Sequence, residues 1–354
     1  MHMADALISP AVGGACWAAS AGGIAYCARR VAQARDDRLV PMMGVLGAFV
    51  FAAQMVNFSI PVTGSSGHIG GGLLLAILLG PHAAFVVIAS VLAVQALFFM
   101  DGGLLALGCN ILNLGFFPAF LAYALVYRPL AGKATGGTRL WIASVVAAVV
   151  GLQLGAFGVV AETTLSGISE LPFGTFLLLM QPIHLAIGAV EGLATAAVVA
   201  FVAGARPEAL APLVPAAAAP ANWRPVVVGL ALAAVVIGGV GGWFASSHPD
   251  GLEWSIAKAT GQEEIAGAGS GLHEKAAAFQ QQTALMPDYG FRGPAREGAS
   301  ADQGAAESAA WPAVEAGTTV AGVAAGGLVV GVAGLLVDPL PARKARAASG
   351  SGPA

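Results

Sequence analysis

The chain has 354 residues, of which 57% are hydrophobic and only 10% are charged. A soluble domain usually carries about 25% charged residues, so this composition excludes an ordinary soluble protein. Long apolar runs recur along the chain and predict an all-α, polytopic bundle of membrane helices. The net charge of −3 comes without a basic patch, which excludes a nucleic-acid partner and leaves membrane lipid as the expected surroundings.

The three cysteines, Cys16, Cys27 and Cys109, all fall inside apolar runs. Their odd number and their spacing match neither a zinc motif nor a disulfide framework. We therefore interpret them as small packing residues.

The first ten residues, MHMADALISP, have the groups of a metal chelator. A free α-amine at Met1, the amide nitrogen of His2 and the His2 imidazole can close two fused rings on one ion. Such a nitrogen-rich site favours Ni(II) or Cu(II) over Mg or Ca. The alternative is a polar residue at a frayed terminus. No cleavable signal is evident before Arg29–Arg30, so we expect Met1 to be the mature terminus.

Two spans are predicted at residues 10–28 and 40–57, followed by the glycine-rich stretch PVTGSSGHIGGG. The apolar run after His68 ends at Gly80–Pro81. It can form only ~18 Å of helix, against a hydrocarbon core of ~30 Å. This predicts a half-length helix that starts at His68, inside the membrane thickness, with the loop before it dipping inward. The positive end of that helix would lower the pKa of His68 and keep it neutral, as a metal ligand must be.

Further spans are predicted at residues 83–100, 103–127, 139–160 and 173–202. His82 falls at the opposite membrane face from His68, so we do not predict it as a ligand. His184 and Glu191 are seven residues apart and share one helical face. They form either a partner contact or conformational latch, or a buried structural pair, since a carboxylate inside a span must be paired or face a cavity. Support for the His68 loop or hydrogen bonds between helices is expected from several polar residues: Ser65, Ser66, Asn57, Gln95, Asn110, Asn113 and Gln153.

A Pro/Ala-rich tract at 203–222 predicts a semi-rigid tether between two functional units. An eighth span at 225–245 and a ninth at 315–337 then flank a hydrophilic segment, 246–314. That segment opens with HPDGLEWSIAKATG and predicts two short helices, near 252–266 and 272–285. Its stretch 297–310 is small and polar, which indicates disorder.

The basic residues are distributed unevenly among the loops. With the N-terminus outside, the inner loops hold 12 of the 16 Lys and Arg residues. The other four lie in the long outer segment, where charge does not set orientation. We therefore expect a multi-pass protein of the inner (cytoplasmic) membrane, its N-terminus extracytoplasmic and its C-terminus cytoplasmic. Met1, His2 and His68 then lie on the same side of the membrane.

Three segments, MHMADALISP, VTGSSGHIGGGLLLAILLGP and QPIHLAIGAVEGLAT, resemble the M component of cobalt and nickel energy-coupling-factor transporters, their substrate-capture subunit. HPDGLEWSIAKATG, with ALMPDYGF at 284–291, resembles the N component. The chain therefore resembles an M–N fusion. Its motif for the N component comprises Pro249, Asp250, Gly251, Leu252, Glu253 and Trp254. Family members often begin MHIPDG or MHIMEG, and Met3 and Ala4 depart from both, which leaves the choice between nickel and cobalt open.

The resemblance implies a seven-span capture domain and two further spans around an extracytoplasmic loop. It implies that Ni(II) or Co(II) is bound as substrate, with no cofactor, by the Met1 amine, the His2 amide and imidazole, and the His68 imidazole. It also implies a separate T- or Q-type coupling subunit and ATPase subunits, and the chain itself has no GxxxxGK[ST] loop for ATP. The expected organisation is 1–205 for capture, 206–224 as linker, 225–340 as the N-like domain and 341–354 as a cytoplasmic tail.

Two other functions stay open from the sequence. The first is an ion-coupled secondary metal carrier that uses His184 and Glu191 as its relay. The second is a structural or assembly membrane protein that binds no metal. An enzyme is not predicted, because the sequence shows no nucleophile–base pair and no open-site metal motif.

Overall fold

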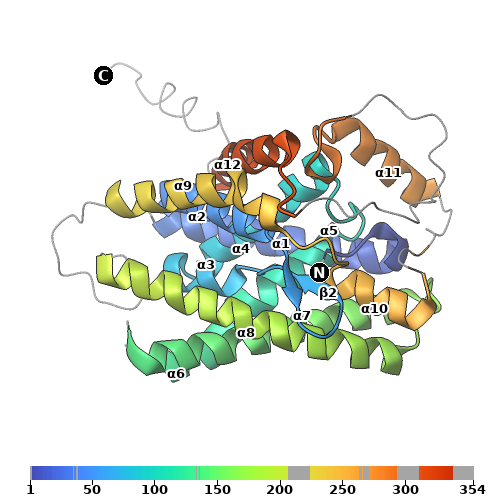
Figure 1. Ribbon diagram of the computed structural model, residues 1–354, viewed down its shortest axis with the longest axis horizontal. Helices are drawn as coiled ribbons and strands as arrows, with labels where there is room; N and C mark the ends of the chain where they lie inside the picture. Colours follow the sequence, from blue (N-terminus) through green and yellow to red (C-terminus); the bar gives the residue numbers. More distant parts are fainter. Residues whose placement is uncertain are drawn as a thin grey trace, which may run out of the picture.

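The computed structural model describes residues 2–34, 36, 39–132, 134, 136–205, 224–262, 265, 271–292 and 311–337. Met1, nearly all of the predicted linker, the stretch 297–310 and the predicted tail 341–354 lie outside these residues. Figure 1 shows helices α7 (Gly137–Ser166) and α8 (Phe173–Ala205) lying along the longest axis of the molecule. Strand β2 (Ser65–Gly67) and helices α10 (Gly251–Thr260) and α11 (Gly271–Thr283) gather at one end, and α6 (Arg128–Ala131) lies at the other.

The first two thirds of the described chain forms η1 and eight α-helices, two of which run on through wide π-type turns (η2 and η3). Their bounds are η1 Asp5–Leu7, α1 Pro10–Ala34, α2 Leu39–Gln54, α3 Gly72–Leu79, α4 Pro81–Val94 with η2 Gln95–Phe99, α5 Leu107–Ile111 with η3 Leu112–Tyr127 and α6 Arg128–Ala131, α7 Gly137–Ser166, and α8 Phe173–Ala205. Pro118 lies within η3, where the wide turns accommodate a residue that has no N–H to donate.

The last third adds five helices. They are α9 Arg224–Gly239, η5 Gly241–Phe244, α10 Gly251–Thr260, α11 Gly271–Thr283 and α12 Ala316–Val337, with a short turn η6 Pro287–Tyr289. Helices thus form at every range predicted from the sequence, with bounds that differ by a few residues. Six of the described helices are long and apolar enough to cross a membrane, while α2 and α9 are shorter. The six are α1, α4 continued by η2, α5 continued by η3 and α6, and then α7, α8 and α12.

The half-length helix is confirmed, but the position predicted for His68 is wrong. Helix α3 begins at Gly72, so His68 lies in an irregular stretch before the helix. Gly71, at the helix N-cap, has φ +80°, a left-handed conformation that glycine adopts without strain. The glycines after His68 delay the start of the helix, and the helix dipole therefore does not act directly on the imidazole.

An antiparallel hairpin precedes His68 and was not predicted. Strand β1 (Phe58–Ile60) pairs with β2 (Ser65–Gly67), with Phe58 opposite Gly67. Three-residue strands are too short for an alternating apolar pattern to stand out in the sequence. The hairpin lies at one end of the bundle, and its second strand ends at Gly67, directly before His68.

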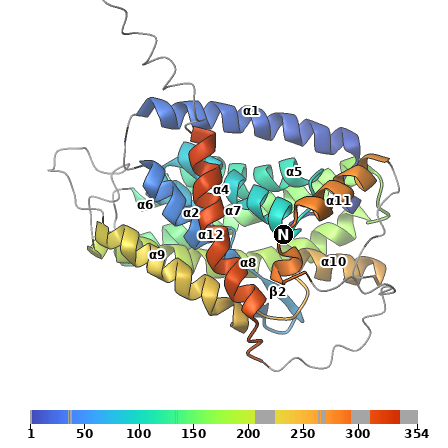
Figure 2. The same cartoon turned by 90° about the horizontal axis from the view of Figure 1, so that it is seen from above.

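Small residues allow the helices to approach closely. A Cβ at Gly192 of α8 would lie 2.3 Å from Val145 Cα of α7, and one at Gly322 of α12 would lie 2.1 Å from Gly238 O of α9. Helix α12 also packs on α2, where a Cβ at Gly47 would lie 2.7 Å from Val329. Figure 2 shows α12 crossing α2 and α4. Helices α9 and α12 thus both pack directly on α2, in the first part of the chain.

Candidate metal-binding site

The residues after His2 are inserted into the bundle. Met3 is fully buried, and its N–H donates to Asn110 Oδ1 at 2.9 Å. Its carbonyl accepts from Asn110 Nδ2 at 3.3 Å and from the Gly103 N–H at 2.9 Å. Farther along, the Asp5 carboxylate accepts from the Ala106 N–H at 2.9 Å. The start of the described chain is therefore held in place by α5 and the loop before it, and it is not a frayed end.

His2 lies against a carboxylate that the sequence analysis did not identify. His2 Nδ1 is 2.5 Å from Asp101 Oδ1. The Tyr289 hydroxyl donates to Asp101 Oδ2. Because a carboxylate only accepts, His2 Nδ1 carries the proton, and in the neutral ring the lone pair is then on Nε2. That Nε2 atom is buried and has no hydrogen-bond partner among the residues that the structure describes.

His68 lies next to His2. Their ring centroids are 5.0 Å apart, with the ring planes tilted by 39°. His68 Nδ1 is 3.0 Å from the carbonyl oxygen of Ile69, which accepts its hydrogen. The lone pair of a neutral His68 is therefore on Nε2, the form in which a histidine can bind a metal.

The stretch after His68 is held by polar side chains from two helices. The Glu191 carboxylate of α8 accepts from the Gly70 N–H at 2.7 Å and the Gly71 N–H at 3.1 Å. Gln54 Nε2 of α2 donates to the Gly70 carbonyl at 2.8 Å. These bonds satisfy the backbone that would otherwise stay unpaired at this depth, and they fix the position of His68.

The electrostatics of the site favour a bound cation. Burial is the main cause that lowers the pKa of His68, to about 3, so this imidazole is neutral at physiological pH. Burial acts to raise the pKa of Asp101, but the interaction with His2 and the hydrogen bonds from His2 and Tyr289 bring it below its ordinary value. The site thus places one carboxylate charge, on Asp101, close to the neutral His68 imidazole.

His184 and Glu191 lie on the same helix but make separate contacts. His184 Nδ1 donates to the Met180 carbonyl at 2.8 Å, within α8, while Glu191 binds the Gly70–Gly71 backbone. In the described part of the chain the two side chains are therefore not a hydrogen-bonded pair, and this geometry favours a structural role for Glu191 in the His68 loop.

The hairpin residue Ser66 connects the loop to the C-terminal segment. Ser66 donates through its N–H to the Pro249 carbonyl at 2.8 Å and through its hydroxyl to the His248 carbonyl at 2.8 Å. Ser65 Oγ lies 2.7 Å from Thr63 Oγ1. The Asn57 carbonyl accepts from the Ser246 N–H at 2.8 Å.

The PDGLEW motif starts α10 and places it on the hairpin and on α8. Asp250 accepts from the backbone N–H groups of Leu252 and Glu253, while Glu253 accepts from the Asp250 N–H, which is a capping box. Trp254 Nε1 donates to the Thr63 carbonyl at 2.9 Å. A Cβ at Gly251 would lie 2.6 Å from Ile183, so only glycine permits this contact. The motif thus works as a docking element next to the His68 loop.

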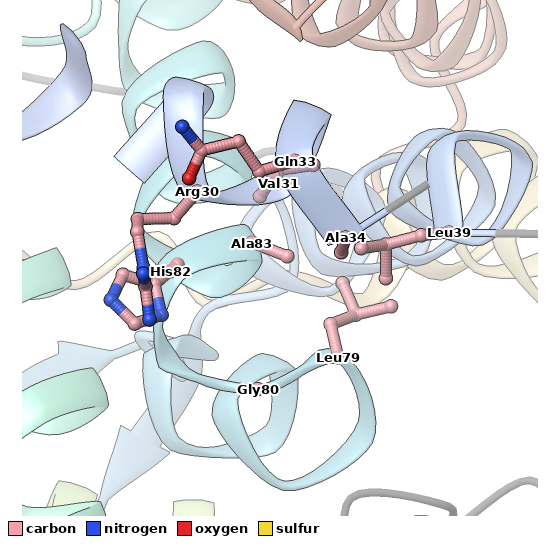
Figure 3. A pocket seen from close by; sticks show the side chains of 9 residues that line it. All are labelled: Arg30, Val31, Gln33, Ala34, Leu39, Leu79, Gly80, His82 and Ala83. Atoms are coloured by element: carbon pink, nitrogen blue, oxygen red, sulfur yellow. The ribbon is translucent and has the colours of Figure 1, made fainter. Parts of the chain in front are cut away.

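His82 lies far from this site along the fold. It lines a pocket of about 370 Å³ with Arg30 and Gly80, beside the end of α1 and the start of α2 (Figure 3). The structure thus places His82 in a different part of the fold from His2 and His68. The residues that the sequence analysis missed are Asp101 and Tyr289. Their only signals were an acidic residue between two apolar runs and a tyrosine inside the segment ALMPDYGF.

Comparison with known protein families accounts for both parts of the chain. Residues 2–209 match the model for the cobalt uptake substrate-specific transmembrane region, and residues 224–338 match the model for the PDGLE domain. The chain belongs to the cobalt uptake family. It combines the transmembrane region of that family with a PDGLE domain, as the resemblance to an M–N fusion predicted.

The relatives and structures similar to this chain are transport proteins. A putative metal transport protein of Haloquadratum walsbyi is 33% identical over 59% of this chain and 92% of its own length. A putative fused nickel transport protein of Archaeoglobus fulgidus is 35% identical over 59% of this chain and 68% of its own length. The crystal structure of a truncated transition metal transporter matches 58% of this chain and 99% of its own, with 29% identity and a TM-score of 0.52. The protein is thus a membrane subunit of a cobalt or nickel transporter family.

Proposed function

We propose that the protein captures Ni(II) or Co(II) at the extracytoplasmic side of the membrane and delivers the ion to an ATP-driven importer. The observation that carries the proposal is the 5.0 Å separation of the His2 and His68 rings, with Asp101 hydrogen-bonded to His2. Residues distant in the sequence meet here as two imidazoles and one carboxylate. Nitrogen ligands of this kind select late transition metals over Mg or Ca.

The proposed ligands are the Met1 amine, the amide and imidazole nitrogens of His2, and Nε2 of His68. A chelate ring that joins the His2 amide to its own imidazole closes through Nδ1, because Nε2 is on the far side of the ring. The ring proton of His2 must therefore move from Nδ1 to Nε2, which ends the hydrogen bond to Asp101, and the amide proton is released to solvent as the metal binds. The Asp101 charge then remains close to the ion and offsets part of its charge.

The delivery step needs partners. The proposal assigns ATP hydrolysis to separate ATPase subunits and the membrane step to a T- or Q-type coupling subunit. It assigns seven spans to residues 1–205 and two to the N-like domain, with the site outside and the C-terminus in the cytoplasm. The distribution of basic residues and the fused nickel transport relatives support it.

Two measurements test the proposal together. Purified full-length protein is titrated with Ni(II) and with Co(II), and uptake is measured in cells with and without active ATPase subunits. We expect tight binding of at least one ion, and uptake that stops when the ATPases are inactivated. Uptake that continues without ATPases but is abolished by an uncoupler would instead support the secondary carrier. Absence of binding would support the structural protein.

A further inference from the structure

Two cysteines and a glutamate meet between α1, α5 and α7, outside the site described above. Their ligand atoms, Cys16 Sγ, Cys109 Sγ and one carboxylate oxygen of Glu162, all lie within 4.8 Å of one another. Cys109 is fully buried, and the other two residues are half-buried. The cluster combines residues distant in the sequence, so no local motif could have predicted it.

Close helix contacts build the cluster. A Cβ at Gly108 would lie 2.4 Å from the Trp17 backbone nitrogen, and Ser20 Oγ donates to the Gly108 carbonyl at 2.7 Å. These contacts hold the backbones of α1 and α5 together beside Cys16 and Cys109. One helical turn before Glu162, a Cβ at Gly158 would lie 2.2 Å from Asn113 Oδ1, so α7 also approaches closely.

The carboxylate is oriented toward the sulfur atoms. Asn113 Nδ2 donates to Glu162 Oε2 at 2.7 Å, and Cys16 Sγ lies 3.8 Å from Oε1. Asn113 is one turn beyond Cys109 on the same continuous helix, so both side chains face α7. An amide that holds a carboxylate in place is the kind of outer support that metal ligands usually have.

The charges and spacing fit a metal ion. A carboxylate inside a membrane span needs a partner that offsets its charge. The structure shows hydrogen bonds to Glu162 from Cys16 and Asn113, and both of these partners are neutral groups. Around a tetrahedral metal with Zn-like bond lengths, two sulfur atoms are about 3.8 Å apart and a sulfur and an oxygen about 3.6 Å apart. The 3.8 Å between Cys16 Sγ and Glu162 Oε1 is already close to the second value, and all three ligand atoms lie within 4.8 Å of one another.

We propose that Cys16, Cys109 and Glu162 form a second metal site, for a thiophilic divalent transition metal such as Co(II), Ni(II) or Zn(II). Two sulfur ligands exclude Mg and Ca. On binding, each thiol loses its proton to solvent as its metal–sulfur bond forms, so two protons are released for one ion bound. Three protein ligands leave the fourth position open for exchange.

The second site lies next to the first but does not depend on it. Met3, the neighbour of His2, has its sulfur 3.9 Å from Asn113 Nδ2, and Asn110 on the same helix holds the Met3 backbone. An ion at the cysteines would thus be bound close to Met3, the residue that follows His2 in the chain. The assignment rests on the cluster geometry and holds whether or not His2 binds an ion.

Cobalt distinguishes the two sites, because only sulfur ligands give a thiolate-to-cobalt charge-transfer absorption. Full-length protein carrying His68→Ala, purified under reducing conditions, is titrated with Co(II). We expect this absorption to appear and to saturate at one ion per chain. Adding Cys16→Ser or Cys109→Ser should abolish it. The matched control is Cys27→Ser, a buried cysteine farther along α1 and outside the cluster, which should leave the absorption unchanged.

Glu162→Gln provides a second test that retains both thiols. We expect the absorption to remain while Co(II) affinity falls at least about tenfold. The proposal is overturned if the His68→Ala protein shows no thiolate absorption, or if the absorption survives in both serine variants. A Cys16–Cys109 disulfide in the reduced preparation would overturn it as well. Loss of nitrogen-site binding in wild-type protein, with the thiolate absorption intact, would contradict the proposed capture site alone.

Discussion

Tyr289 and Asp101 connect the PDGLE domain to the transmembrane region at the candidate capture site. The Tyr289 hydroxyl donates to Asp101 Oδ2, and the other oxygen of the same carboxylate bonds His2 Nδ1 at 2.5 Å. The tyrosine ring is itself fixed, because it stacks on Phe99 with centroids 5.0 Å apart. A residue of the PDGLE domain thus orients the carboxylate that orients His2.

This relationship predicts that Tyr289→Phe weakens metal affinity although Tyr289 is not a proposed ligand. Without the hydroxyl, one oxygen of Asp101 loses its hydrogen bond. Removing a group that supports a metal ligand without binding the metal itself costs about 10–100-fold in affinity. We expect the lower end, about tenfold, since the stacked ring remains. Isothermal titration with Ni(II) measures the effect. Tyr26→Phe, an exposed tyrosine on α1, is the control and should bind like the wild type.

His68→Ala should abolish tight binding, because three ligands would leave one corner of the square to water. The fold should persist, since Glu191 and Gln54 hold the loop through the Gly70 and Gly71 backbone rather than through the imidazole. Affinity and thermal unfolding are measured on the same preparation. His82→Ala removes a histidine at the start of α4, beyond the end of α3 that is distant from His68, and should leave affinity intact. Near-normal affinity in His68→Ala would rule out the four-nitrogen site.

The helix ranges could be predicted from the sequence, because long apolar runs and the glycines between them are local signals. The approach of His2 to His68 could also be predicted, from the distribution of basic residues among the loops and from the resemblance of the motifs that contain them. The exact setting of His68 could not, since three glycines allow either a helix start or an irregular loop, and only packing against Glu191 decides. Asp101 and Tyr289 were missed because their pairing is made by tertiary contact across 188 positions of the chain. The same holds for Cys16 and Cys109, which the sequence indicated only as packing residues.

Glu191→Gln should loosen the His68 loop. The amide retains one acceptor oxygen but places an NH₂ group against one of the two backbone N–H donors at Gly70 and Gly71. A buried donor left without an acceptor costs about 1–3 kcal/mol. We expect a lower unfolding temperature and weaker Ni(II) binding together. Glu170→Gln, an exposed glutamate before α8, is the control. Unchanged affinity and stability would show that Glu191 does not support the loop.

Metal binding should weaken as the pH falls from about 8 to 5, and His68 should contribute nothing to that change. Its folded-state pKa of about 3 lies below this window, so the imidazole stays neutral and free of proton competition throughout. The competing protons belong to the α-amine, with an ordinary pKa of about 7.7–8.0, and to the His2 amide, which must lose its proton when the metal binds. Dissociation constants are measured across the range. A constant value from pH 8 to 5 would argue for oxygen ligands.

The terminus itself gives the most direct test of the capture site. If the α-amine is a ligand, one residue added before Met1 converts it to an amide and moves His2 out of its place in the chelate. The chain cannot shift along its path to restore the chelate, because Met3 is fully buried and hydrogen-bonded to Asn110 and Gly103. We therefore expect an N-terminal extension to abolish binding as fully as His68→Ala does.

Two further forms separate chemistry from packing. Acetylation of the amine removes the ligand with only a small steric change and should also abolish tight binding. A tag after Ala354 leaves the amine free and should leave affinity at the wild-type value. The forms are titrated side by side with Ni(II) after each is shown to unfold at the temperature of the untagged protein. If the extended protein binds as tightly as the one tagged after Ala354, the metal is not held by the terminus, and His2 and His68 must bind it with other partners.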